Sequence, residues 1–153
     1  MKIELVRGAC QRISPIRPDY AARPIRDAFS WSSSLAGCPF DRLYLVVFRS
    51  VRRPDADLEH LREHDDRAYA EALDSGGLLR YFKGEANERR ECLSFCLWET
   101  RKQAIEAAGA VSHQSAADIS VRMYQSYVLD RYWLKKVVTG WGERLIFEPI
   151  QSA

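Results

Sequence analysis

The sequence predicts one α+β domain in which two helices cover an antiparallel β-sheet. The length of 153 residues suits a single domain. The composition, with 46% apolar and 29% charged residues, is typical of a globular protein rather than a disordered one. After residue 42, short apolar and β-branched runs alternate with segments of helical spacing, and this order indicates the α+β class.

Several segments have the composition of β-strands. Residues 43–50 and 92–98 are apolar at consecutive positions, so we expect these two strands to be buried on both faces. Aromatic and β-branched residues bounded by glycines and a proline indicate further strands. These strands are predicted at residues 78–85, 124–138 and 145–147.

Two helices are predicted between the strands. The first spans residues 54–75, and the glycine pair at 76–77 ends it. The second begins after Thr100, which can cap it, and Gly109 interrupts it before a further segment over residues 112–123. The resulting order is β-α-β-β-α-β with an additional C-terminal strand, which is the ferredoxin-like plan.

Residues 1–42 are predicted to form an irregular N-terminal arm before the ferredoxin-like domain at residues 43–150. This segment holds seven Lys and Arg against four Asp and Glu, and its arginines are interleaved with prolines. Such a composition favours an extended, solvated arm. The alternative is an arm that covers a partner subunit or closes a pocket.

A homodimer is predicted from the two-sided apolar strands. The helices would cover one face of the sheet, and the other face also needs cover. A second copy of the sheet is the simplest cover, and a two-fold dimer is the commonest way to provide it.

The sequence indicates neither nucleic acid nor a membrane as a partner. The net charge of +2 is too small to indicate nucleic-acid binding, and residues 79–85 only distantly resemble the basic-aromatic strand motif of RNA-binding sheets. We expect no membrane association, because no apolar stretch approaches the length of a membrane span. The N-terminus lacks the apolar region of a signal peptide, and the four cysteines form no C-x-x-C pair. We therefore expect a cytoplasmic protein.

A short strand–helix pattern resembles a known family. Residues 97–100 (Leu-Trp-Glu-Thr), a helix with Ala104 and Ala107, and the Ser-His pair at 112–113 resemble the signature of antibiotic biosynthesis monooxygenase-like domains. The resemblance covers about residues 43–138. It implies a member of the dimeric α+β barrel superfamily, whose ligands lie between the sheet and its helices.

The resemblance leaves the reaction open. The superfamily includes cofactor-free oxygenases acting on aromatic polyketides, haem-degrading enzymes, isomerases, cyclases and members with no known reaction. The haem-degrading members have an Asn on the first strand and a His well inside the second helix. Residues 43–50 contain no Asn, and His113 stands at the helix start, so haem degradation is disfavoured. No cofactor is expected.

Asp65 is the most informative candidate, because it falls inside the apolar stripe of the first predicted helix. A buried carboxylate costs free energy unless it is paired, and perturbed acids gather at functional sites. Asp65 is therefore a candidate catalytic base, or a group that orients one. Alternatively, it pairs with Arg49 or Arg80 on the sheet, and Arg49 is also a candidate substrate-binding residue. The stripe consists of Leu58, Leu61, Ala68, Tyr69 and Ala72.

His113 is the second candidate catalytic residue. Its pKa near neutrality suits proton exchange with a bound phenol or enol, although a His at a helix start can equally face solvent. Aromatic side chains on the sheet suit a flat, hydrophobic ligand, or else form core or dimer interface. The candidate substrate-binding aromatics are Tyr81, Trp98, Tyr124 and Tyr127.

His60 and His64 spell H-x-x-E-H with Glu63, a pattern of zinc proteases. Two His four residues apart on a helix can share a metal ion. No third ligand is identifiable, so we predict no specific metal site and at most adventitious binding.

The leading functional hypothesis is an enzyme: a cofactor-independent oxygenase, isomerase or cyclase acting on a hydrophobic, aromatic, polyketide-like substrate. Asp65 and His113 would move protons, and the Tyr and Trp side chains would shape the pocket. The alternative is a non-catalytic small-molecule-binding or dimerisation module. An open pocket lined by Asp65, His113 and a Tyr favours the enzyme, and a filled space favours the module.

Overall fold

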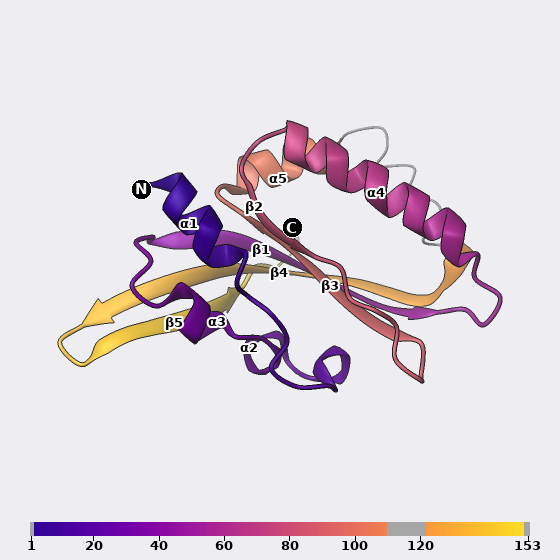
Figure 1. Cartoon of the computed structure of the whole chain (residues 1–153), viewed down its shortest axis with the longest axis horizontal. Helices are drawn as coiled ribbons and strands as arrows, with labels where there is room; N and C mark the ends of the chain where they lie inside the picture. Colours follow the sequence, from indigo (N-terminus) through magenta and orange to yellow (C-terminus); the bar gives the residue numbers. More distant parts are fainter. Residues whose placement is uncertain (1, 110–121, 152–153) are drawn as a thin grey trace.

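The structure, a computed structural model, describes residues 2–109 and 122–151 and has the predicted α+β fold (Figure 1). Antiparallel strands form one sheet in the order β2-β3-β1-β4-β5. The first four positions of this order are ferredoxin-like, and β5 adds an edge strand next to β4. The strands are β1 (Arg42–Arg52), β2 (Leu78–Phe82), β3 (Glu91–Trp98), β4 (Tyr124–Thr139) and β5 (Gly142–Pro149).

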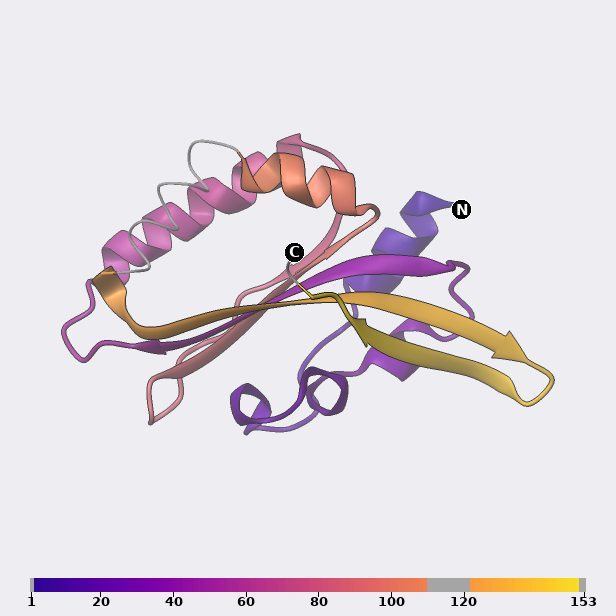
Figure 2. The same ribbon diagram turned by 180° about the vertical axis from the view of Figure 1, so that it is seen from behind.

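Two helices, α4 (Leu58–Asp74) and α5 (Arg101–Ala108), lie over one face of the sheet (Figure 2). Both have side-chain caps: the Asp57 carboxylate accepts from a backbone N–H in the first turn of α4, and Thr100 does the same for α5. The glycine pair at 76–77, with φ near +75°, ends α4 as predicted. Residues 112–121 of the predicted segment at 112–123 lie outside the described residues. No helix of the described chain is long and apolar enough to cross a membrane.

The N-terminal segment differs from the extended, solvated arm expected from the sequence. It forms a layer of short helices on the sheet face opposite α4 and α5 (Figures 1 and 2). Its helices are only three to eight residues long, which is too short for a helical repeat of apolar residues to stand out in the sequence. The arginines and prolines between them further suggest an irregular segment. They are α1 (Ile3–Cys10), η1 (Tyr20–Ala22), α2 (Ile25–Ala28) and α3 (Trp31–Leu35).

Trp31 joins this N-terminal layer to the sheet. Its side chain is 2% exposed, and its indole N–H donates to the Ile25 carbonyl at 2.8 Å. Its ring centroid lies 5.1 Å from that of Phe95 on β3 and 5.4 Å from that of Phe147 on β5. The larger of the two hydrophobic clusters therefore lies between the N-terminal layer and the sheet.

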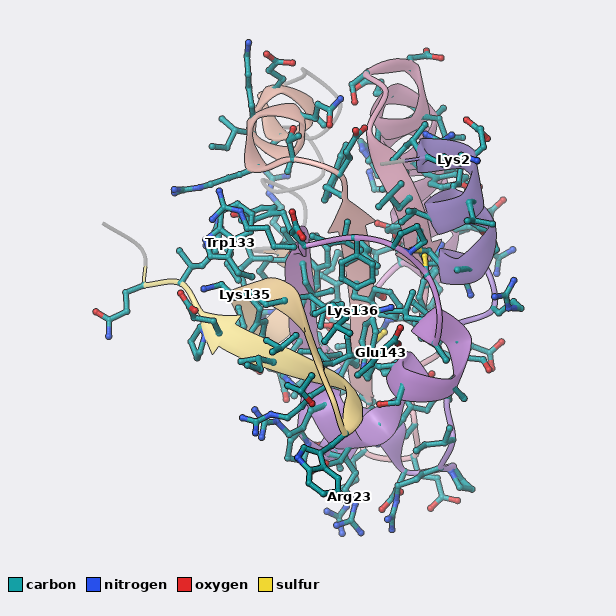
Figure 3. All side chains as sticks on the ribbon, turned by 90° about the vertical axis from the view of Figure 1, so that its left-hand side faces the viewer. Lys2, Arg23, Trp133, Lys135, Lys136 and Glu143 are labelled. Carbon is teal, nitrogen blue, oxygen red and sulfur yellow. The ribbon has the colours of Figure 1, made fainter. Side chains whose placement is uncertain are left out.

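Lys136 of β4 and Glu143 of β5 form a polar link to the same layer (Figure 3). The Lys136 ammonium is almost fully buried, donates to the carbonyls of Leu35 and Cys38, and lies 3.3 Å from the Glu143 carboxylate. That carboxylate also accepts from the Gly37 N–H at 3.1 Å. The buried lysine is thus satisfied, and the chain after α3 is fixed to the β4–β5 hairpin.

This arrangement bears on the predicted homodimer. The prediction rested on a second apolar sheet face, for which a second copy of the sheet was the simplest cover. In the structure, residues 3–40 of the same chain cover that face. This side of the sheet therefore does not need a second copy of the chain to cover its apolar residues.

Candidate functional site

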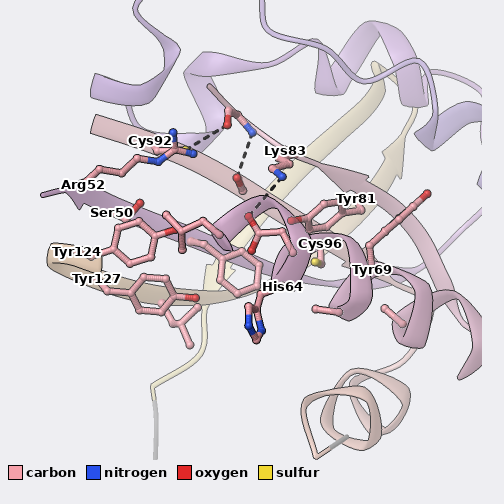
Figure 4. A pocket seen from close by; sticks show the side chains of 18 of the residues that line it. Ser50, Arg52, His64, Tyr69, Tyr81, Lys83, Cys92, Cys96, Tyr124 and Tyr127 are labelled. Atoms are coloured by element: carbon pink, nitrogen blue, oxygen red, sulfur yellow. Dashed lines mark hydrogen bonds and ion pairs between the residues drawn. The ribbon is translucent and has the colours of Figure 1, made fainter. Parts of the chain in front are cut away.

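A cavity of about 240 Å³ lies between α4 and the sheet (Figure 4). The inner face of α4 forms one wall through Leu61, Asp65, Ala68 and Ala72. Side chains of alternate positions on the sheet form the other wall, because every second side chain of a strand points to the same face. The sheet residues are Phe48, Ser50 and Arg52 of β1, Tyr81 of β2, Cys92, Ser94 and Cys96 of β3, and Tyr124, Tyr127 and Leu129 of β4.

Asp65 enters this cavity from α4, as its place in the apolar stripe predicts. Its carboxylate lies 3.4 Å from the Lys83 ammonium, and the two side chains are 29% and 33% exposed. Burial raises the pKa of Asp65 above its ordinary value, and the positive charges of Lys83 and Arg52 offset only part of this effect. The charged carboxylate is therefore held in an environment that favours its protonation.

Lys83 reaches Asp65 because the chain after β2 passes close to β3. The Gly84 N–H donates to the Ser94 hydroxyl at 3.1 Å, and the Cys92 thiol donates to the Gly84 carbonyl at 3.2 Å. A Cβ at Gly84 would lie 2.0 Å from the carbonyl oxygen of Leu93. Only glycine permits this approach without a backbone shift, and the approach brings Lys83 over the cavity.

The predicted aromatic residues Tyr81, Tyr124 and Tyr127 line the cavity together. The rings of Tyr124 and Tyr127 stack at a centroid distance of 5.6 Å, and Tyr69 of α4 lies 5.1 Å from Tyr81. Burial raises the pKa of Tyr124 to about 12 and also raises the pKa values of Tyr81 and Tyr127. These phenols are therefore uncharged hydrogen-bond donors at neutral pH.

Two arginines expected near Asp65 lie elsewhere. Arg49 faces the N-terminal layer, where its guanidinium donates to the carbonyls of Ala21 and Arg23 at 3.1 and 2.7 Å. Arg80 donates to the carbonyl of Ile13 at 3.2 Å. Arg49 is thus not part of this cavity, and neither arginine is the partner of Asp65.

The two remaining predicted site residues, Trp98 and His113, are not part of the described cavity lining. Trp98 is on the same sheet face but is buried beneath α5, in the smaller cluster with Tyr44, Ala104 and Ala107, and does not line the cavity. His113 lies outside the described residues.

Sequence reasoning missed three ionisable residues of the cavity: Arg52, His64 and Lys83. The alternation of Phe48, Ser50 and Arg52 was a usable signal, but the predicted strand ended at residue 50. His64 also contacts His60, with ring centroids 4.7 Å apart. In the described part of the chain, no three His, Cys, Asp or Glu side chains are grouped to hold a metal ion.

A family model matches most of the chain. The model of the PB2B2.08-like family matches residues 2–146. The chain belongs to this family. The curated UPF0643 protein PB2B2.08 of Schizosaccharomyces pombe is 28% identical over 113 residues, which make up 70% of this chain and 50% of that protein. The chain thus spans about half the length of the curated relative it matches.

Solved structures similar to this PB2B2.08-like chain share its fold. A putative antibiotic biosynthesis monooxygenase from Nitrosomonas europaea aligns with a TM-score of 0.53 and 12% identity over 63% of this chain and 92% of its own. A putative antibiotic biosynthesis monooxygenase from Caulobacter crescentus CB15 aligns with a TM-score of 0.52 and 14% identity over 64% of this chain and 92% of its own. Rv0793 from Mycobacterium tuberculosis aligns with a TM-score of 0.51 and 19% identity over 58% of this chain and 91% of its own. The predicted resemblance to antibiotic biosynthesis monooxygenase-like domains is therefore confirmed for the fold.

Proposed function

We propose that the cavity binds a small, aromatic, largely apolar molecule, and that Asp65 acts on it as a general acid–base group. The observation that carries this proposal is a half-buried carboxyl group of raised pKa directed into a cavity with apolar and phenolic walls. Titratable groups held in this way in a concave site are candidates for catalysis.

The chemistry available to these residues is proton transfer. An Asp65 carboxylate within reach of an acidic C–H or O–H of the ligand can accept the proton. The neutral phenol of Tyr81 or Tyr124 and the Lys83 ammonium can then stabilise the anion that forms. Proton removal is the first step common to cofactor-independent oxygenation, isomerisation and cyclisation, and the proposed enzyme belongs to this group. The alternative is a non-catalytic module that binds the same ligand.

The size of the cavity restricts the ligand. Pockets for drug-sized ligands have volumes of about 300–1,000 Å³. The volume of about 240 Å³ is below this range and suits a molecule of one or two rings. The stacked pair Tyr124 and Tyr127 offers a flat surface for such a ring.

Native mass spectrometry of the purified chain tests this proposal. We expect a non-covalent small-molecule mass on the parent chain and its loss in Ala68→Phe, because residue 68 lines the cavity and a phenyl ring would fill it. Ala70→Phe is the matched control, because residue 70 is exposed on the same helix and the ligand should be retained. A parent chain without any bound mass, or equal occupancy in all three proteins, would refute the proposal.

The four cysteines support a reducing, cytoplasmic compartment. Cys10, Cys38, Cys92 and Cys96 are all buried and unpaired. Free thiols persist in reducing compartments, whereas secreted proteins commonly pair them. This location is part of the proposal.

The homodimer stays a prediction, but with another surface. The tip of the β4–β5 hairpin exposes Val138 at 71% and Trp141 at 100%, and β5 is an edge strand. Exposed edge strands and apolar tips favour association. We expect light scattering at micromolar concentration to give a dimer that Trp141→Glu dissociates, whereas Leu73→Glu on the exposed face of α4 leaves it intact. A monomeric parent chain would contradict this prediction.

A further inference from the structure

We propose that the ligand of the cavity carries a carboxylate that pairs with Arg52, so that the substrate class is a small aromatic carboxylic acid. This inference rests on the proposed function and specifies its ligand. Arg52 is the last residue of β1 and lines the cavity beside Ser50 and Tyr124 (Figure 4).

Among the residues that the structure describes, none supplies a counter-charge to the Arg52 guanidinium. Its Nε is enclosed and has no hydrogen-bond partner, and no carboxylate of the described chain lies within ion-pair distance of its guanidinium. The nearest acid in the cavity, Asp65, is paired with Lys83 at 3.4 Å. Burying a guanidinium without a counter-charge costs free energy even where a neutral phenol such as that of Tyr124 contacts it, and an anionic ligand would remove that cost.

The charges of the cavity lining agree with this assignment. Arg52 and Lys83 contribute two positive charges, and Asp65 is the single carboxylate among the described lining residues. The phenols stay neutral because burial raises their pKa values. At least one positive charge among the described lining residues is therefore left for the ligand to balance, and a protonated His64 would add a second.

The strand register places this charge at one end of an apolar surface. Arg52 pairs with Tyr124, and the pairs that follow on the same face are Ser50 with Tyr127 and Phe48 with Leu129. The wall thus changes from charged through polar to apolar along β1 and β4. A molecule that matches this order has a carboxylate next to Arg52 and a ring against Phe48 and Tyr127.

Isothermal titration of the full chain with two matched probes tests the inference. 2-Naphthoate and 2-naphthamide have the same two-ring body, but only the first is charged. Hydrogen bonds to charged groups contribute about 1.5–3 kcal/mol, which converts to a preference of about tenfold to a hundredfold for naphthoate. Arg52→Met should abolish this preference. Arg89→Met, which removes an exposed arginine from the β2–β3 loop, should preserve it.

The outcomes separate the two proposals. Equal affinity of the parent chain for both probes overturns the carboxylate assignment and leaves the aromatic cavity standing. A preference for naphthoate that survives in folded Arg52→Met also overturns it. Binding of neither probe overturns both this inference and the proposed function. The preference of the parent chain is measured without any substitution, so a failure of Arg52→Met to fold does not affect that readout.

Discussion

Trp31→Ala is expected to lower the free energy of unfolding by about 3–5 kcal/mol, the range for truncating a buried Trp or Phe. The indole is 2% exposed and packs between Phe95 and Phe147, on two different strands. The substitution also leaves the Ile25 carbonyl without its donor. The loss should be visible as a lower denaturation midpoint in urea, with circular dichroism as the probe.

The matched control is Ile16→Ala, in the same N-terminal segment. Ile16 is 60% exposed, so its truncation should change the free energy of unfolding by no more than about 0.5 kcal/mol. If Trp31→Ala cost as little as Ile16→Ala, the N-terminal layer would not be part of the core. The segment would then be the solvated arm that its composition suggested.

The parts of the fold that the sequence revealed are those with strong local signals. The apolar runs of β1 and β3, the cap at Thr100 and the glycine pair at 76–77 each act within a few residues, so they are readable without tertiary structure. The N-terminal layer has no such signal. Its helices are stabilised by burial against the sheet, because isolated helices this short are not stable in water.

The candidate site could be predicted from α4 but not from the sheet. Helical spacing alone puts Asp65 among the apolar residues that face inward. Successive side chains of a strand point to opposite faces of the sheet. Arg49 and Arg52 are an odd number of positions apart, so they point to opposite faces. Because the strand is apolar on both faces, the sequence did not indicate which arginine shares a face with α4.

Asp65→Asn is expected to abolish any acid–base activity of the cavity at little cost in stability. An amide cannot accept the proton, so turnover should fall steeply. The Asp65–Lys83 pair is only about one-third exposed, but burial raises the pKa of Asp65 in spite of Lys83, so the pair does not compensate the cost of burying the carboxylate charge. Water entering the cavity can solvate Lys83 once the carboxylate is gone.

The raised pKa of Asp65 fixes the sign of its pH dependence. The folded state holds the proton more tightly than the unfolded state, whose pKa is near 3.8. Stability of the parent chain should therefore fall as the pH rises from the unfolded pKa through the higher folded pKa. The Asp65→Asn variant has no carboxyl group at this position and therefore lacks this pH dependence. Its stability relative to the parent should improve over the same pH interval.

The most direct test of the central claim is a pair of urea denaturation curves at neutral pH, for the parent chain and for Asp65→Asn. If Asp65 faces a ligand cavity, the substitution should cost less than about 1 kcal/mol or should stabilise the chain. If Asp65 instead forms a structural buried ion pair, removing its charge should cost about 3–5 kcal/mol. A loss of that size would contradict the assignment of Asp65 to a functional cavity.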